Sequence, residues 1–203
     1  MDINFVEAAA LAEIDRHLQD NSSVSPAQYE IIRKVIYSTA DFEYNSLLKF
    51  SNEPLFRGYK ALTSSLPIIV DVPEIQVSIV PRLQQTFYNS VYCCATTGTE
   101  SSQTKTKAAF GLETLANEHN NNILVIGQDQ TTLEVAIDLA KNGVINPSLA
   151  IATAPLFIEQ DIKQYLKTAS FPTIYIDSSK GGATVAAAIF NGLVDLAWRV
   201  NHR

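Results

Sequence analysis

The chain has 203 residues, of which 46% are hydrophobic and 18% charged, enough apolar surface for one folded domain without disulfides or a structural metal. Its net charge of −6 excludes a nucleic-acid-binding protein, because phosphate backbones need concentrated Lys and Arg; a polyanionic small ligand stays open if a few cations gather locally. We see neither a signal peptide nor a run of about 20 apolar residues that would span a membrane. We therefore expect a single cytoplasmic domain over residues 1–203.

Two helices are predicted at the beginning of the chain. Apolar residues at helical spacing predict the first helix over residues 5–19. Ser25 followed by Pro26 is typical of a helix start, with serine as the N-cap and proline in the first turn. The apolar face that follows carries the second helix to Tyr37.

A polar turn after the second helix brings together side chains that suit a site. Tyr37 ends the helix, and Thr39 and Asp41 follow directly. A tyrosine commonly buries its ring and exposes its hydroxyl to solvent, so the alternative to a chemical role for Tyr37 is a structural place in the core. Asp41 either caps a following helix from Tyr44 or contacts a ligand.

Continuous apolar runs predict strands that are covered on both faces, over residues 67–72, 122–127, 148–152 and 173–177. Residues 85–94 are a candidate further strand. Between the runs, the pattern predicts helices over residues 103–118, 130–142, 159–168 and 182–199. Strands that alternate with helices favour an α/β fold of three layers, a mainly parallel sheet with helices on both faces. The last helix suits either the core or a subunit contact.

The predicted strands end in polar residues and glycines. In a parallel sheet, ligands bind beyond these carboxyl ends, where loops and helix N-termini converge. The residues at the strand ends include Asp71, Gly127-Gln128, Thr153 and Lys180-Gly181-Gly182. Lys180 suits a ligand carboxylate, and the glycine pair suits either close approach of a ligand or tight packing. The Gly127 segment lacks the further glycines of a dinucleotide fingerprint.

Thr104, Lys105 and Thr106 lie where the helix over residues 103–118 begins. A lysine near a helix N-terminus opposes the helix dipole. Lys105 and Lys107 therefore either meet a negative partner or are simply solvated.

The cysteines and histidines do not suggest a metal or a general base. Cys93 and Cys94 are adjacent, and no His or Cys lies at zinc-site spacing, so we predict buried structural cysteines and no metal site. His17, His119 and His202 are expected to lie away from the strand ends.

Several short motifs follow one another in a specific order: Tyr29 to Arg33, Val35 to Glu43, Pro67 to Asp71, Thr104 to Thr106, Val125 to Gln128, and Lys180 to Asn191. Over about residues 25–196 this order resembles the precorrin-8X methylmutase (precorrin isomerase) family, the corrin-ring isomerases of cobalamin biosynthesis. The resemblance implies an isomerase without a cofactor that moves a methyl group between adjacent ring carbons of a corrinoid. It also implies a homodimer that binds a small-molecule substrate.

The resemblance assigns the catalytic position to Tyr37, where the family carries histidine. It assigns substrate binding to polar side chains and glycines at the strand ends and in nearby turns, namely Thr39, Asp41, Asp71, Thr104, Lys105, Thr106, Gly127, Gln128, Lys180, Gly181 and Gly182.

The chain departs from the family at several of these places. Lys105 stands for an arginine, and Asp177 and Ser179 stand at two further arginine positions. Each change removes a group that would bind a carboxylate in bidentate fashion. The alternative to an active methylmutase is therefore a non-catalytic homologue that binds a tetrapyrrole or a partner protein.

Overall fold

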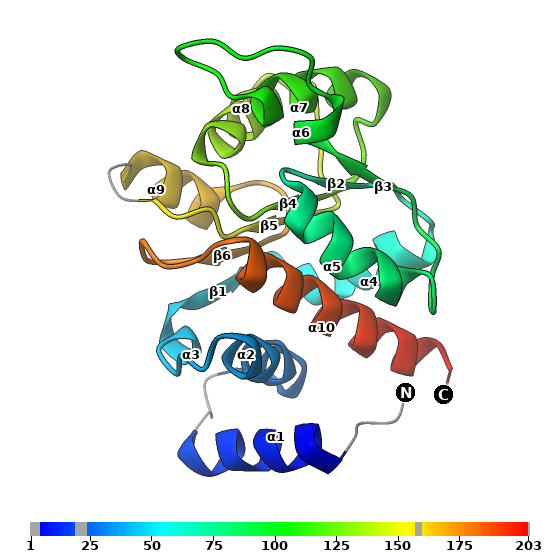
Figure 1. Cartoon of the computed structure of the whole chain (residues 1–203), viewed down its shortest axis with the longest axis vertical. Helices are drawn as coiled ribbons and strands as arrows, with labels where there is room; N and C mark the ends of the chain where they lie inside the picture. Colours follow the sequence, from blue (N-terminus) through cyan, green and yellow to red (C-terminus); the bar gives the residue numbers. More distant parts are fainter. Residues whose placement is uncertain (1–4, 19–23, 157–159, 203) are drawn as a thin grey trace.

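The structure, a computed structural model, describes residues 5–18, 24–156 and 160–202. Within these residues, six strands form one sheet in the order β1-β6-β5-β4-β2-β3 (Figure 1). The strands are β1 (Leu48–Ser51), β2 (Ile68–Val70), β3 (Val91–Cys93), β4 (Ile123–Ile126), β5 (Leu149–Ala152) and β6 (Thr173–Ile176). All neighbours are parallel except β1, which pairs antiparallel with β6. The predicted α/β fold with a mainly parallel sheet is confirmed.

Helices cover both faces of the sheet, because its central strands are apolar on both sides. Every residue of β2, β4, β5 and β6 is buried. In β4, for example, Ile123 and Val125 belong to one core, and Leu124 and Ile126 belong to the other. The alternation of side chains along each strand therefore feeds two separate hydrophobic cores.

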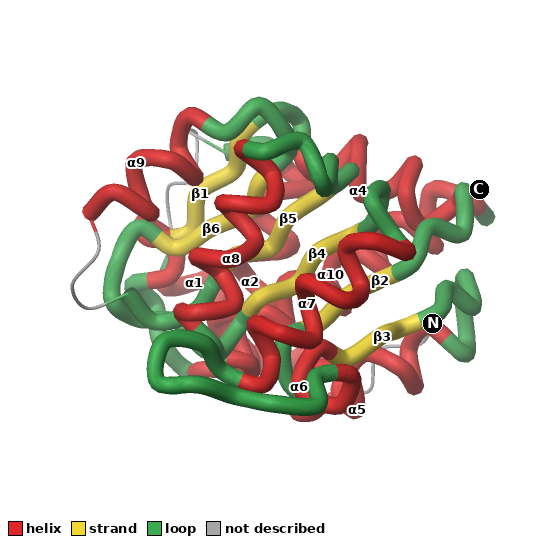
Figure 2. Tube along the Cα trace, turned by 90° about the horizontal axis from the view of Figure 1, so that it is seen from above, coloured by secondary structure: helices red, strands yellow, loops and turns green. Residues whose placement is uncertain are grey.

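The first core lies between the sheet and α2 (Pro26–Thr39), α4 (Pro54–Thr63), α5 (Pro73–Leu83) and α10 (Ala183–Asn201). The second lies under α7 (Lys107–Glu118), α8 (Gln130–Lys141) and α9 (Gln160–Thr168); Figure 2 shows α7 and α8 over the strands. Two short helices, α3 (Tyr44–Leu47) and α6 (Cys94–Thr97), connect strands to their neighbours. Outside these layers, α1 (Phe5–His17) packs on α2.

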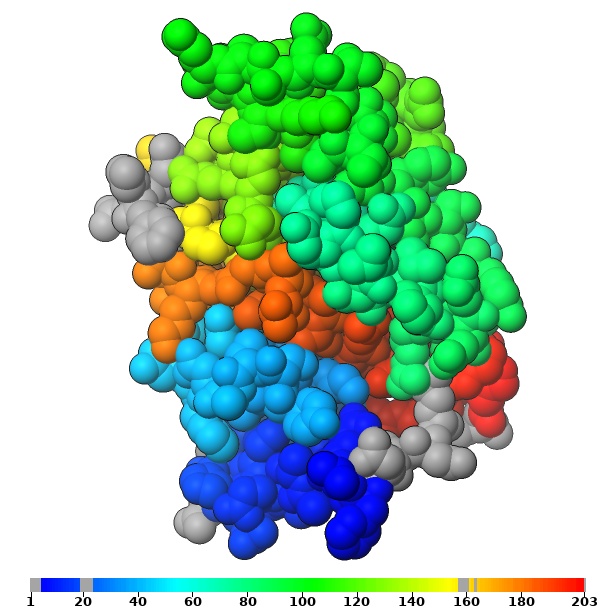
Figure 3. All heavy atoms as spheres, in the orientation of Figure 1, coloured from blue at the N-terminus to red at the C-terminus, as the bar shows by residue number. Residues whose placement is uncertain are grey.

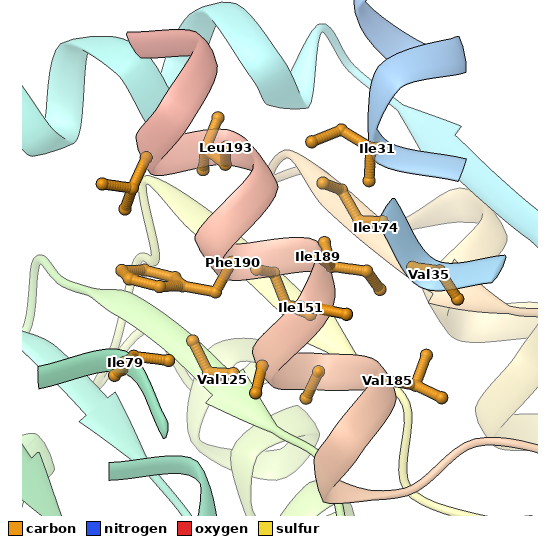
Figure 4. Close-up of a cluster of buried hydrophobic side chains, with 14 of the residues drawn as sticks. Ile31, Val35, Ile79, Val125, Ile151, Ile174, Val185, Ile189, Phe190 and Leu193 are labelled. Atoms are coloured by element: carbon orange, nitrogen blue, oxygen red, sulfur yellow. The ribbon is translucent and has the colours of Figure 1, made fainter. Parts of the chain in front are cut away.

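The central helix of the first core is α10. Val185, Ile189, Phe190 and Leu193 project from it among strand and helix side chains in Figure 4. Of the described helices, α10 is the one long and apolar enough to cross a membrane, but 56% of that stretch is buried inside the protein. This burial is the pattern of a core helix.

Three parts of the fold differ from the sequence prediction. β1 was not predicted, because it has four residues and only Leu48 among them is buried. Periodicity did not reveal α4 or α5 either. The strand expected within residues 85–94 is limited to Val91–Cys93, since residues 84–87 form turns after α5 and residues 88–90 are irregular.

Helix boundaries shift by a few residues. The helix expected from residue 103 begins at Lys107, because Thr106 is its N-cap and accepts a hydrogen bond from the N–H of Ala109. α1 ends at His17, α2 runs on to Thr39, and α10 extends to Asn201. The expected start of a helix at residue 159 lies outside the described residues.

Candidate functional site

The loops after β2, β4, β5 and β6 lie at one edge of the sheet, and the turn between α2 and α3 (residues 40–43) joins them there. We call this set of loops the carboxyl edge. It contains or adjoins most of the predicted site residues.

Asp71 holds the loop that follows β4. Its side chain is fully buried, and its two carboxylate oxygens accept hydrogen bonds from four backbone N–H groups, those of Val72, Gly127, Gln128 and Asp129, at 2.7–3.1 Å. Burial raises the pKa of Asp71, and the N–H donors act against that rise. As placed, the carboxylate contacts protein rather than solvent, and it fixes the backbone on which Gln128 is presented.

Glycine is required at two places along the edge because other chain segments come too close. A Cβ on Gly127 would lie 2.8 Å from the Cβ atom of Ala186, and one on Gly181 would lie 2.0 Å from the carbonyl oxygen of Thr153. Gly181 (φ 150°) and Gly182 (φ 108°) also adopt backbone angles that favour glycine. Gly127 and Gly181 therefore serve packing, whether or not a ligand approaches them.

Thr153 joins the loop after β5 to the loop that opens α10. Its carbonyl accepts from the N–H of Gly182 at 2.8 Å, and its hydroxyl donates to the Gly182 carbonyl at 3.1 Å. Gln128 lies beside the same glycine, since a Cβ on Gly182 would be 3.7 Å from the Gln128 Oε1 atom. The β4, β5 and β6 loops are thus in direct contact.

The α2–α3 turn begins with a left-handed residue. Ala40 has φ 55° and donates its N–H to the carbonyl of Ile36, which ends the helix. The hydroxyl of Thr39 donates to the Val35 carbonyl at 2.8 Å and accepts from the N–H of Asp41 at 3.3 Å. Tyr37, one turn earlier, has 41% of its surface exposed.

Lys180 bridges the α2–α3 turn and the start of α10. Its Nζ atom lies 2.7 Å from the Asp41 carboxylate and 2.9 Å from the Glu43 carboxylate. Figure 3 shows the light-blue atoms of this turn directly against the orange atoms of the β6–α10 loop. The hydrogen bond to Asp41 raises the pKa of Lys180 to about 12, and the same bond lowers the pKa of Asp41. Asp41 does not cap α3, whose N-cap residue is Glu43.

The segment before α7 is tied to the β4–α8 loop. Thr106 donates its hydroxyl proton to Asp129, whose carboxylate also accepts from the Thr132 hydroxyl at 2.6 Å and from the N–H of Thr131 at the start of α8. Asp129 therefore links the N-termini of two helices. Lys105 is paired with Glu113 of α7 at 2.5 Å, and Thr104 lies exposed beside Ser102.

The structure thus brings Asp41 and Lys180 together, and Asp71 together with Gly127 and Gln128. Lys105 faces α7 rather than Lys180. Residues outside the predicted set also take part, namely Glu43, Glu113, Asp129 and Thr153. Thr153 directly follows a buried strand and was recognised in the sequence among the strand-end residues, but without a binding role; pairing of the other three depends on tertiary contacts.

The expectation that all three histidines lie away from the strand ends holds only in part. His17 lies beside the α2–α3 turn, with its ring centroid 5.2 Å from that of Phe42. This corrects its expected place away from the strand ends, because α1 packs on α2 and His17 is the last residue of α1. His119 stacks on Tyr92, and His202 on Trp198.

No metal site is found in the part of the chain that the structure describes, where no three His, Cys, Asp or Glu side chains gather suitably. Cys93 and Cys94 are free thiols and both are buried. Burial raises the pKa of Cys94 well above the usual thiol value, so it is a poor nucleophile.

A cavity of about 590 Å³ lies apart from the carboxyl edge, between α1, α2, α5 and α10. We call it the charged cleft, because it is lined by Glu7, Glu30, Arg33, Lys34, Arg82, Asp195 and Arg199 as well as Leu11, Gln85, Asn191, Gly192 and Trp198. None of the predicted site residues lines it. The positions of Tyr37, Asp71, Lys105 and Lys180 in the sequence also predict that they line one cavity, but Asp71 is fully buried and none of the four lines the charged cleft.

A sequence profile of the precorrin-8X methylmutases matches residues 6–196, nearly the whole chain. The chain belongs to the precorrin-8X methylmutase family. This membership places it among the isomerases of cobalamin biosynthesis, as the ordered motifs indicated.

Members of this family from distant organisms are similar along most of their length. The cobalt-precorrin-8 methylmutase of Synechocystis is 31% identical, with 94% of each chain covered. The enzyme of the same name from Methanocaldococcus jannaschii is 34% identical over 82% of this chain and 79% of its own. The crystal structure of the precorrin-8X methylmutase from Thermus thermophilus superimposes with a TM-score of 0.86, at 25% identity, over 96% of both chains.

Proposed function

We propose that the chain catalyses the migration of a methyl group between adjacent ring carbons of a corrinoid, as a precorrin-8X methylmutase. The observation that carries the proposal is similarity to a cobalt-precorrin-8 methylmutase over 94% of both chains. The meeting of several loops at the carboxyl edge supports it, since that edge is where parallel sheets bind ligands.

In this proposal the site residues have different tasks. Tyr37 donates a hydrogen bond to the ring; its side chain is partly exposed near the end of α2, next to the α2–α3 turn. Thr39, Asp41, Thr104, Lys105, Gln128 and Lys180 contact or orient the side chains of the ring. Asp71, Thr106, Gly127, Gly181 and Gly182 shape the loops that carry those contacts. Because the migration is intramolecular, positioning supplies a large part of the rate.

We also propose a cytoplasmic homodimer that binds neither membranes nor nucleic acid. The family resemblance supports the dimer, and the net charge of −6 supports the absence of a nucleic-acid partner. Light scattering on the purified chain tests the dimer, and a monomeric mass would contradict it.

Turnover of precorrin-8X, and of its cobalt form, followed by visible absorbance, tests the function. We expect turnover by the unmodified protein and a loss of at least about tenfold in kcat for Tyr37→Phe, because a positioned proton or hydrogen-bond donor contributes about that much or more. The matched control is Tyr88→Phe, an exposed tyrosine before β3 at the opposite edge of the sheet, which leaves kcat unchanged.

Other outcomes separate the alternatives. Binding of hydrogenobyrinic acid without turnover of either substrate would favour a non-catalytic tetrapyrrole-binding homologue. Absence of both binding and turnover would reject the corrinoid assignment.

A further inference from the structure

The α6–α7 segment (residues 98–106) includes three residues of the predicted binding set, Thr104, Lys105 and Thr106. It forms the green loop at the top of Figure 1, and the residues at its centre are exposed. Two of its hydrogen bonds lie within the segment: the N–H of Ser102 donates to the Lys105 carbonyl at 2.8 Å, and the Ser102 hydroxyl accepts from the N–H of Lys105 at 3.0 Å. Such bonds stabilise a local turn but do not fix the segment relative to the sheet.

Hydrogen bonds connect both ends of the α6–α7 segment to Asp71. At the first end, the N–H of Ala95 in α6 donates to the Asp71 carbonyl at 3.0 Å. At the second end, the Thr106 hydroxyl donates to the Asp129 carboxylate, and the N–H of Asp129 donates to the Asp71 carboxylate at 2.8 Å. The fully buried Asp71 therefore anchors the first end through α6 and the second end through Asp129.

Asp129 carries the second of these connections. Its carboxylate accepts from the Thr132 hydroxyl at 2.6 Å and from the N–H of Thr131 at 3.2 Å, and both of these donors belong to α8. The bond from Thr106 comes instead from a different segment, 23 residues earlier in the chain. Hydrogen bonds to a carboxylate are stronger than those between neutral groups. Asp129 therefore restricts the position of Thr106 and of the residues just before it.

We propose that Asp129 is a positioning residue for the corrinoid substrate: its bond to Thr106 keeps the α6–α7 segment in the arrangement in which Thr104 and Lys105 contact the ring. When only a fraction of the molecules has the arrangement that binds, the apparent affinity falls by that fraction, while the bound state reacts at the same rate. Asp129 acts through Thr106 and does not itself touch the substrate. The proposal rests on the proposed function, since it assumes that a corrinoid binds at the carboxyl edge.

Asp129→Ser in the full chain tests the proposal. Serine remains a good N-cap for α8, but its shorter side chain cannot also reach Thr106. We expect KM for precorrin-8X to rise by about tenfold, because one hydrogen bond to a charged group commonly contributes that factor or more, and kcat to stay within about twofold. Steady-state turnover followed by visible absorbance measures both constants.

Thr132→Val is the matched control. It removes a different hydroxyl from the same carboxylate, inside α8, and leaves the bond between Thr106 and Asp129 in place. KM should therefore stay within about twofold of the unmodified value. Asp129→Asn is the second variant if Asp129→Ser does not fold: it keeps the N-cap and one acceptor oxygen, so KM should rise by a smaller factor, about threefold.

Hydrogen exchange gives a readout that needs no substrate. In Asp129→Ser, the amides of residues 101–106 should exchange at least about threefold faster than in the unmodified chain, because the segment has lost a bond that holds it. The amides of β4 should exchange at an unchanged rate, which would show that the fold as a whole is retained.

The outcomes separate the positioning role from the proposed function. If the unmodified chain turns over neither precorrin-8X nor its cobalt form, the proposed function fails and the positioning role fails with it. If the unmodified chain is active and Asp129→Ser keeps its KM, only the positioning role is refuted. A fall in kcat without a rise in KM, or an equal rise in KM for Thr132→Val, would refute it as well.

Discussion

At the scale of single residues, Asp71 shows how a buried charge can shape a site without facing a ligand. Four N–H groups converge on its carboxylate, three of them from the β4–α8 loop. The sequence predicted its position at the end of a strand, because the apolar run before it is plain. It could not predict that the side chain turns inward, since that depends on a loop more than 50 residues later in the chain.

Asp71→Asn should destabilise the protein by about 2–4 kcal/mol. Asparagine offers one acceptor oxygen where aspartate offers two, so two N–H groups would lose their acceptor and face an NH₂ group. Urea denaturation measures the change. Asp138→Asn, an exposed residue on α8, is the control and should change stability by less than about 0.5 kcal/mol. Equal effects of the two substitutions would contradict the role assigned to Asp71.

The pair formed by Asp41 and Lys180 gives a pH dependence with a definite sign. The folded pKa of Asp41 is lowered, so its stabilisation is complete above the ordinary value of 3.8 and is lost as the pH falls through the lowered value. The folded pKa of Lys180 is raised to about 12, so its stabilisation is complete below 10.5 and is lost as the pH rises through about 12.

Thermal unfolding of the unmodified chain and of Asp41→Asn checks this window. The unmodified chain should be the more stable at pH 7, and the difference should vanish once the pH lies well below 3.8. A difference of the same size at neutral and acid pH would show that Asp41 acts through something other than its charge.

At the scale of elements, ion pairs hold the helices around the charged cleft. Asp195 of α10 pairs with Arg82 of α5, and its other oxygen lies 3.9 Å from Lys34 of α2. Lys34 also pairs with Glu7 of α1 at 3.1 Å. α1 buries Leu11 and Ile14, and the pairs of Glu7 with Lys34 and of Asp15 with Arg33 also attach it to α2.

A double-mutant cycle on Arg82 and Asp195 should give a coupling free energy of about 1–3 kcal/mol, because their side chains are only 27% and 22% exposed. The same cycle on Arg16 and Glu13, which are 73% and 50% exposed, should give about 0–0.5 kcal/mol. Denaturation at low and high salt measures both. Similar coupling in the two cycles would mean that burial does not strengthen the first pair.

The elements were predicted unevenly for a physical reason. Strands buried on both faces have continuous apolar runs, so β2, β4, β5 and β6 were visible in the sequence. β1 lies at the sheet border with one buried residue, and its pairing with β6 joins Ser51 to Thr173. No local pattern contains that contact. The same holds for the bond between Asp41 and Lys180, which are 139 residues apart.

At the scale of the whole molecule, stability depends on α10, which contacts α2, α4 and α5 as well as the sheet. Phe190 on this helix is fully buried. Phe190→Ala should cost about 3–5 kcal/mol, from lost apolar contact and the cavity left behind. Val200→Ala on the same helix, at a side chain that is 60% exposed, should cost less than about 1 kcal/mol. Calorimetry on both variants decides whether α10 is the core helix that its burial indicates.

The direction of β1 determines at which edge of the sheet the end of α2 lies. Because β1 runs against its neighbour, Leu48 at its beginning lies opposite Ile176 at the end of β6. If β1 were parallel to β6, Leu48 would lie opposite Thr173 instead, and the chain just before it, which includes Tyr37 and Asp41, would be displaced by about 10 Å along the strand axis. Because β1 is antiparallel to its neighbour, the α2–α3 turn contacts the β6–α10 loop, which lies more than a hundred residues later in the chain.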